Sequence, residues 1–368
     1  MSNHVSSGQS RPWYEHITID LLARVLNNSI FQPFIAWLAL LCQSAVGASS
    51  TSFRFRATLN YACLLSLFSF LKLLDELYAY GRPRKLDWDE EVVVITGGAR
   101  GLGKILAEVY GMRGASVAVL DVQKPSKESE GLAGVEVYEC DVGDAEAVEK
   151  VKLQIETDLG IPTILINNAG IVYGKPLLSL GSHEVEKSFK VNTLAHFNTI
   201  RTFLPTMLAS KTGGTIVTVA SVLGKLGASH LSDYTATKAA LIAMHSSLRA
   251  ELNSPSTAPE GAANIRTVLV TPGQLSTNLF QGVKTPSSFL GPVVETVELA
   301  REIVKMVDSG MSGEISLPLY ARWIDWLHVL PPGLGKLVRG LSGMDRAMEG
   351  FGAAQSKISK MAGGVKVQ

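Results

Sequence analysis

Residues 92–103 read Val-Val-Val-Ile-Thr-Gly-Gly-Ala-Arg-Gly-Leu-Gly, and this stretch decides the fold. Its first half is an apolar, β-branched run typical of a buried strand, and a helical sequence follows the glycines. Glycines at positions 97, 101 and 103 allow a tight turn, close approach of backbone N–H groups to a pyrophosphate, and close packing of strand on helix. A strand, a glycine turn and a helix in this order predict a dinucleotide-binding site.

The acid that ends the next apolar run bears on the choice of dinucleotide. Asp121 lies 18 residues after Gly103, where a carboxylate accepts hydrogen bonds from the adenosine ribose hydroxyls. Arg100, inside the glycine turn, could instead pair with the 2′-phosphate of NADP(H), or could be a solvated turn residue. Because the ribose lies directly against the end of the second strand, we give Asp121 more weight and expect NAD(H) to be favoured over NADP(H).

From residue 91 onward, short Val/Ile-rich runs alternate with longer, more polar stretches of helical length. This alternation is typical of a parallel sheet covered by helices. It predicts an α/β fold, a Rossmann-type doubly wound domain over residues 89–320. The seven expected strands lie at residues 92–96, 116–120, 135–139, 163–166, 215–219, 266–270 and 314–316.

The composition limits the classes of function. Charged residues make up 18% of the chain, against roughly 25% in soluble domains, and apolar residues make up 46%. The 34 basic and 33 acidic residues leave a formal charge of +1, so no overall field would collect nucleic acid, and we expect no nucleic-acid partner. The three cysteines and the histidines show no metal-ligand spacing, so we expect neither a disulfide framework nor a metal site.

The apolar excess is concentrated in residues 1–88. The 29 residues between Arg24 and Arg54 carry no formal charge and are long enough to cross a hydrocarbon core, which needs about 20 residues, although Pro33 interrupts them. A second apolar run, residues 57–71, is shorter. The two runs predict an N-terminal membrane anchor of two apolar helices, and both a two-helix hairpin and an anchor that dips into the membrane fit. A buried helical domain is the alternative, and a cleaved signal peptide fits poorly.

Basic residues directly after the second apolar run suggest the orientation of the predicted domain. Arg82, Arg84 and Lys85 follow the second apolar run, and such clusters favour the cytosolic side of a membrane. We therefore expect a cytosolic domain at the endoplasmic reticulum or a lipid droplet.

The amphipathic tail, residues 321–368, contains the aromatic stretch 322–330 and could rest on a membrane interface, close over a site, or pack against the domain.

Three residues predict hydride transfer between a carbinol carbon and a nicotinamide. Tyr234 and Lys238 stand four residues apart on an expected helix, hence on one face. A free phenol, with a pKa of about 10, is a poor base at neutral pH unless its phenolate is stabilised, which the Lys238 ammonium would do. Ser221, at the end of the fifth expected strand, can hydrogen-bond a substrate oxygen.

Together these motifs resemble the short-chain dehydrogenase/reductase family over about residues 91–318. The matching segments are Thr96–Gly103 (T-G-x-x-x-G-x-G), Asn167–Gly170 (N-N-A-G), Asn192, Ser221, Tyr234–Lys238 (Y-x-x-x-K), and Pro272-Gly273 with Thr277. Residues 168–173, 191–197 and 216–221 most resemble the membrane-associated retinol and 17-beta-hydroxysteroid dehydrogenase branch. The members of that branch carry an apolar N-terminal anchor and act on lipophilic alcohols.

The resemblance implies a specific set of site residues. The catalytic set is Asn192, Ser221, Tyr234 and Lys238, with Asn192 supporting Lys238 through a water molecule. The cofactor-binding set is Gly97, Arg100, Gly101, Leu102, Gly103, Asp121, Asp141, Val142, Asn168, Ala169, Gly170, Tyr234, Lys238, Pro272, Gly273 and Thr277. Asp141 and Val142 would bracket the adenine, although a role for Asp141 in capping the following helix is nearly as good. Asn167 is expected to tie neighbouring strands together.

The sequence therefore predicts a membrane-associated oxidoreductase that interconverts a lipophilic alcohol and its carbonyl with NAD(P)(H). The substrate would be retinoid-, steroid- or fatty-alcohol-like, and its selection would depend on residues 276–292 and on the tail. A non-catalytic nucleotide-binding protein at a membrane or lipid-droplet surface is the alternative; the intact catalytic set argues against it. A homodimer is compatible with the sequence.

Overall fold

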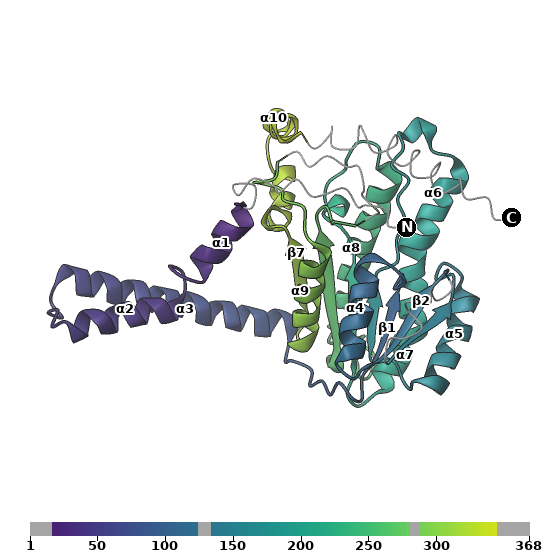
Figure 1. The fold of residues 1–368 in the computed structure, drawn as a ribbon, viewed down its shortest axis with the longest axis horizontal. Coiled ribbons are helices and arrows are strands. Elements are labelled where there is room, and N and C mark those ends of the chain that lie inside the picture. Colours follow the sequence, from purple (N-terminus) through teal and green to yellow (C-terminus); the bar gives the residue numbers. More distant parts are fainter. Residues whose placement is uncertain (1–16, 124–133, 278, 280–286, 344–368) are drawn as a thin grey trace, which may run out of the picture. The chain divides into compact units, whose positions relative to one another are not determined.

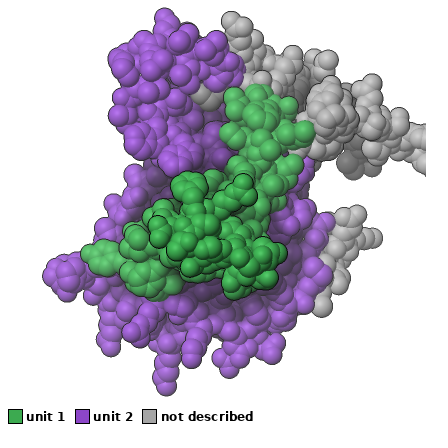
Figure 2. Space-filling view, turned by 90° about the vertical axis from the view of Figure 1, so that its left-hand side faces the viewer, with its two compact units in different colours: residues 1–81, 287–292 green, residues 82–286, 293–368 purple. Residues whose placement is uncertain are grey.

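The structure is a computed structural model that describes residues 17–123, 134–277, 279 and 287–343 (Figure 1). The chain divides into two compact units, coloured separately in Figure 2. One unit comprises residues 1–81 and 287–292, and the other comprises residues 82–286 and 293–368. Residues 344–368 of the expected tail, and residues 278 and 280–286 of the expected specificity segment, lie outside the described residues.

The larger unit contains a seven-stranded sheet in which all neighbouring strands are parallel. The strands are β1 (Val92–Thr96), β2 (Ser116–Asp121), β3 (Val135–Glu139), β4 (Ile164–Asn167), β5 (Gly214–Val219), β6 (Ile265–Pro272) and β7 (Gly313–Leu317). Their order is β3-β2-β1-β4-β5-β6-β7, so the chain changes direction across the sheet between β1 and β4. This confirms the predicted doubly wound fold and puts its switch point, where such folds bind ligands, at the glycine turn.

Helices cover both faces of the sheet (Figure 1). They are α4 (Gly101–Met112), α5 (Ala145–Asp158), α6 (Ser182–Phe189), α7 (Ala195–Ala209), α8 (Ser232–Leu252) and α9 (Thr296–Asp308). Val93 and Ile95 of β1 pack with α4 and α9, whereas Val92 and Val94 pack with α5 and α7. Successive strand side chains point to opposite faces, so a strand covered on both sides must be apolar throughout, as β1 is.

Shorter helical segments connect these elements. They are the 3-10 turns η2 (Leu177–Ser179), η4 (Val222–Gly224), η5 (Ala262–Asn264), η7 (Leu319–Arg322) and η8 (Ile324–His328), the π-helical turn η3 (Lys190–Leu194), and the C-terminal helix α10 (Pro332–Ser342). Turn η7 follows β7 directly, so the described part of the tail starts at the sheet.

The smaller unit consists of α1 (Ile19–Asn27), α2 (Pro33–Ala45) and α3 (Phe53–Tyr80). Helices α2 and α3 run side by side in opposite directions (Figure 1). The indole of Trp37 donates a hydrogen bond to Ser66 Oγ at 2.9 Å, and Gln43 Nε2 donates to Thr58 Oγ1 at 2.8 Å. These two bonds link the helices of the hairpin, and many of its exposed side chains are apolar.

The helices that the two apolar runs form differ in length in the opposite sense to our expectation. The first run yields a helix of only 13 residues, because Pro33 has no backbone N–H to continue a helix and instead occupies the first position of α2. The second yields α3, with 28 residues, which is long and apolar enough to cross a membrane by length and composition. The candidate spanning helix is therefore α3.

A buried ion pair joins the segment after α3 to the sheet. Arg84 Nη2 donates to both carboxylate oxygens of Glu91, at 2.8 and 2.9 Å, and Arg84 Nε donates to the Thr212 carbonyl at 2.7 Å. The Thr163 hydroxyl also donates to Glu91. These partners precede β1, β4 and β5, at the amino edge of the sheet. The expected basic cluster is therefore broken up, since Arg84 is buried with its charge paired.

Candidate active site

The glycine turn joins β1 to α4 and requires its glycines. Gly97 and Gly101 have φ angles of 67° and 58°, in the left-handed region that disfavours other residues. A Cβ atom on Gly103 would lie 2.4 Å from the Gly97 carbonyl oxygen and 2.8 Å from Asn168 Nδ2. The backbone of the turn is thus too closely packed for a side chain at position 103. The turn leads directly into the N-terminus of α4, and helix N-termini stabilise anions such as a pyrophosphate.

The N-N-A-G segment holds the ends of β1 and β4 together. Asn168 Nδ2 donates to the carbonyls of Thr96 and Gly97 at 3.1 and 3.0 Å, and the backbone N–H of Ala169 donates to Thr96 Oγ1 at 3.1 Å. Asn167, in contrast, accepts a hydrogen bond from Thr199 of α7 at 2.7 Å. Its side chain therefore links β4 to a helix, while its backbone stands in register with Thr96 of β1 and Thr218 of β5.

Asp121 lies beside the glycine turn. Its carboxylate accepts hydrogen bonds from the backbone N–H of Ala99 at 3.1 Å and of Gln123 at 3.0 Å. Arg100 stands at the N-cap position of α4 with its side chain exposed. A negative charge is therefore fixed at the end of β2, whereas the positive charge lies on a solvated side chain.

The structure separates the two candidate roles of Asp141. The N-cap of α5 is Asp144, whose carboxylate accepts from the N–H groups of Glu146 and Ala147. Asp141 accepts from the Gly143 N–H at 2.9 Å and pairs with Lys190 at 3.3 Å. The capping alternative for Asp141 is therefore wrong, because the residue three positions later fills that place.

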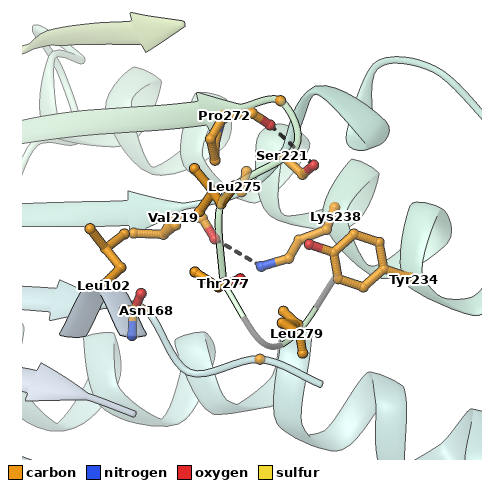
Figure 3. Close-up of a pocket in the computed structure, with 13 residues that line it drawn as sticks. Leu102, Asn168, Val219, Ser221, Tyr234, Lys238, Pro272, Leu275, Thr277 and Leu279 are labelled. Carbon is orange, nitrogen blue, oxygen red and sulfur yellow. Dashed lines mark hydrogen bonds between the residues drawn. The ribbon is translucent and has the colours of Figure 1, made fainter. Parts of the chain in front are cut away.

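Tyr234, Lys238 and Ser221 converge on one cavity (Figure 3). Lys238 Nζ donates to the Val219 carbonyl at the end of β5 at 2.9 Å and lies 5.7 Å from the centroid of the Tyr234 ring. Ser221, two residues after β5, donates to the Pro272 carbonyl at 3.3 Å and accepts from the Leu223 N–H at 3.1 Å. A helix and a strand end thus bring together Ser221 with Tyr234 and Lys238, which follow it by 13 and 17 residues in the sequence.

Burial governs the protonation of these groups. Tyr234 is 4% exposed, Lys238 3% and Ser221 4%. Burial lowers the pKa of Lys238 to about 8. Burial also raises the pKa of the Tyr234 phenol above its ordinary value, and a hydrogen bond with Ser221 acts in the opposite direction. Burial, the larger of these two effects, therefore favours a protonated phenol.

Asn192 lies in the π-helical turn η3, between α6 and α7. Its Oδ1 accepts from the Ile171 N–H at 2.7 Å, and its Nδ2 donates to the Ile171 carbonyl at 3.0 Å and to Thr237 Oγ1 at 3.2 Å. The side chain thus fixes the loop after β4 against α8, beside Lys238. Such π turns are frequent at functional sites. Neither the turn nor the role of Thr237 was expected, although Thr237 stands between the two motif residues.

The cavity wall contains part of the predicted site and adds residues to it. The predicted members are Leu102, Asn168, Gly170, Ser221, Tyr234, Lys238, Pro272, Gly273 and Thr277, and the additional ones are Val219, Ala220, Leu275 and Leu279. The predicted residues Gly97, Arg100, Gly101, Gly103, Asp121, Asp141, Val142 and Ala169 lie instead along the glycine turn and the ends of β2, β3 and β4. Leu275 and Leu279 fall in or beside the expected specificity segment.

An apolar cluster surrounds the phenol. Leu231, which is buried, packs with Tyr234, and Val172, Leu223 and Ala228 pack against the pair. These side chains come from the loop after β4, from η4 and from the start of α8. The reacting end of the cavity is therefore polar at Ser221, Tyr234 and Lys238 and apolar around them.

Comparisons with known proteins agree with this geometry. The family model described as short chain dehydrogenase matches residues 91–287, more than half of the chain. Mouse epidermal retinol dehydrogenase 2 is 33% identical over 301 residues, covering 78% of this chain and 94% of that protein. Human 17-beta-hydroxysteroid dehydrogenase 13 is 32% identical over 244 residues, covering 65% and 78%.

A solved structure shares the fold. The alcohol dehydrogenase of the archaeon Thermococcus sibiricus, complexed with 5-hydroxy-NADP, superposes with a TM-score of 0.52 at 22% identity, covering 62% of this chain and 95% of that one. The matched family model and the relatives together assign the chain. It belongs to the short-chain dehydrogenase/reductase family, in the retinol and 17-beta-hydroxysteroid dehydrogenase branch, and is an NAD(P)-dependent oxidoreductase acting on CH–OH groups.

Proposed function

We propose that this protein transfers hydride between NAD(P)(H) and a lipophilic alcohol or its carbonyl at a membrane, with NAD(H) as the preferred cofactor. The substrate class is retinoid-, steroid- or fatty-alcohol-like. The observation that carries the proposal is the burial of Tyr234, Lys238 and Ser221 together on a cavity that has apolar side chains around its polar end.

The residues at the glycine turn fit a dinucleotide. Gly97, Gly101 and Gly103 leave no side chain between the backbone and a pyrophosphate, and the N-terminus of α4 faces the same turn. The Asp121 carboxylate would accept from the ribose hydroxyls and would repel a 2′-phosphate. Bound NAD(P)(H) supplies or accepts the hydride.

The remaining chemistry belongs to three side chains. In alcohol oxidation, the hydroxyl proton passes to the Tyr234 oxygen as the carbinol carbon loses its hydride; in carbonyl reduction, Tyr234 returns the proton. The Lys238 ammonium stabilises the phenolate between these events, and its bond to the Val219 carbonyl holds it in position. Ser221 orients the substrate oxygen by a hydrogen bond. Asn192 acts as a positioning residue, through Ile171 and Thr237.

Lipophilic substrates are supported by the walls of the site and by the anchor. Leu223 and Val172 line the phenol, and Leu275 and Leu279 line the cavity. The names of the relatives, retinol dehydrogenase and 17-beta-hydroxysteroid dehydrogenase, point to the same class. Helix α3 would hold the protein at the endoplasmic reticulum or a lipid droplet, with the larger unit in the cytosol.

A panel assay tests the proposal against the non-catalytic alternative. Purified full-length protein would be mixed with NAD(H) or NADP(H) and with retinoid, steroid and fatty alcohols or their carbonyls, while the nicotinamide absorbance is followed. The proposal predicts turnover with at least one lipophilic class and not with short polar alcohols. Nucleotide binding without any change in absorbance would favour the binding protein instead.

A further inference from the structure

The described part of the C-terminal tail has one packed side and one open side. Ala321 and Ile324 are buried and, with Tyr320 and Leu327, pack against the loop that follows Ser221. The next residues on the chain face outward: Trp323 is 59% exposed, Trp326 is 64% exposed, and Val329 is also exposed. The inner contacts fix the segment, so its outer aromatic side chains are held in place rather than free to fold inward.

Helix α10, which follows on the chain, also carries exposed apolar side chains. Leu334, Leu337 and Leu341 are exposed and recur at spacings of three and four residues, which places them on one side of the helix. Lys336 and Arg339 lie between them in sequence. We name the exposed apolar set the tail face; it consists of Trp323, Trp326, Val329, Leu334, Leu337 and Leu341.

The charge around the tail face is positive. Arg322, Lys336 and Arg339 are the basic residues of segment 319–342, and its one acid, Asp325, pairs with Lys225 at 3.0 Å. This combination suits the surface of an anionic membrane. Exposed Trp and Leu side chains insert at the boundary of headgroups and acyl chains, and flanking cations bind anionic headgroups. A protein interface would instead be depleted of lysine at its centre.

Two contacts connect the tail face to the substrate side of the cavity. The Lys225–Asp325 pair joins η8 to the loop after Ser221, and Arg339 Nη2 donates to the Gly227 carbonyl of the same loop at 2.9 Å. Gly273, which lines the cavity, has no room for a Cβ because the Tyr320 hydroxyl would lie 2.9 Å from it. Tyr320 of the tail thus lies directly against Gly273, a residue of the cavity wall.

We propose that the tail face is a second membrane-contact surface, lying at the water–lipid boundary of an anionic membrane and bringing the substrate side of the cavity to the lipid. Lipophilic substrate then reaches the cavity from the bilayer rather than through water. The contact with lipid stands on the tail face alone, whereas the route of the substrate rests on the proposed function.

Spin-label accessibility tests the lipid contact without any activity measurement. Full-length protein carrying Cys42→Ser and Cys63→Ser would be labelled at Leu337→Cys and placed in vesicles of phosphatidylcholine with phosphatidylserine. Matched labels would be Lys336→Cys, the neighbour in sequence, and Met112→Cys, 78% exposed at the C-terminal end of α4. Nucleotide binding by each variant would confirm folding, with Leu341→Cys replacing any Leu337→Cys protein that fails.

The proposal predicts that the label at position 337 is accessible to oxygen and shielded from a water-soluble nickel chelate, while the labels at 336 and 112 remain accessible to the chelate. Equal accessibility of positions 337 and 112 to the chelate overturns it. Shielding of position 337 from both reagents also overturns it, because the occupant would then be protein, either a second copy or another part of this chain.

A kinetic comparison tests the route of the substrate. Trp323→Ser with Trp326→Ser should raise the KM for an alcohol dissolved in vesicles several-fold, whereas Met112→Ser should not change it, and neither should alter affinity for NADH. An unchanged KM for the tryptophan variant contradicts the route. If the wild-type protein turns over no alcohol at all, the proposed function fails, while the spin-label result still decides the lipid contact.

Discussion

The Lys238 ammonium lies 5.7 Å from the centroid of the Tyr234 ring, one helical turn away on α8, and donates to the Val219 carbonyl at 2.9 Å. The first relation follows from the four-residue spacing of the two side chains. The second depends on β5 ending where α8 passes, which only the tertiary fold provides. Together they fix a positive charge beside a phenol in a buried site, where its field is strongest.

The affinity for nucleotide should depend on the protonation of Lys238. Burial lowers its pKa to about 8, so the ammonium loses its charge, and its capacity to donate to ribose, as the pH rises through that value. Affinity for NADH should therefore fall between about pH 7 and about pH 9.5. Titration calorimetry would measure it, with Lys238→Met binding more weakly and showing no such pH dependence. A wild-type affinity that stays constant over this range contradicts the role of Lys238.

Cofactor preference should depend on the charge of Asp121. Asp121→Ser should shift the ratio of kcat/KM values toward NADP(H) by about tenfold, or ~1.4 kcal/mol, because a 2′-phosphate no longer meets a carboxylate. Asp121→Asn is the matched control for the bonds from Ala99 and Gln123, since it removes the charge and keeps an acceptor. A wild-type preference for NADP(H) that Arg100→Ala abolishes would reverse the assignment.

Membrane association should depend on α3. Deleting residues 1–80 removes the whole of α3, Phe53–Tyr80, and leaves Arg84 and Glu91 in place, so the product should move from the membrane pellet to the supernatant and still bind NADH. Weak, salt-sensitive binding through the tail is expected to remain. Resistance of the truncated protein to a carbonate wash would show that the main anchor lies elsewhere.

The buried Arg84–Glu91 pair should matter to stability far more than a surface pair. Arg84→Met leaves the Glu91 carboxylate buried without its partner, a cost of about 3–5 kcal/mol. Arg113→Met is the matched control, because its pair with Asp308 is about one-third exposed and should contribute about 0–1 kcal/mol. Thermal melts of the two variants in detergent would compare them. Similar melting temperatures would show that Arg84 is not a structural link.

Much of the fold could be predicted because its signals are local. Each strand is an apolar run between turn residues. The strand and the helix that flank the glycine turn are its direct neighbours in the sequence, so the motif predicts both. The division of the first apolar run at Pro33 depends on a single missing N–H, which a count of uncharged residues does not detect. A count of uncharged residues therefore favours the first run, whereas the helix long and apolar enough to cross a membrane is α3.

The rest of the site depends on distant partners. The burial of Arg84 needs Glu91 and Thr212, 128 positions away, so the same residue looked like part of a cytosolic basic cluster. The resemblance identifies Asn192, but neither its π-helical turn nor the bonds of its amide to Ile171 and Thr237 could be predicted from the sequence. Pairing across such distances has no signal in a single sequence.

The most direct test of the account is the turnover of Tyr234→Phe. The change removes one oxygen and little volume, so folding and NADH affinity by calorimetry should persist, while kcat for the best lipophilic alcohol should fall by about 10²-fold or more. Ser221→Ala should also lower kcat with nucleotide affinity intact. Near-wild-type turnover by a folded, nucleotide-binding Tyr234→Phe protein would contradict the assignment of Tyr234 as the acid and base.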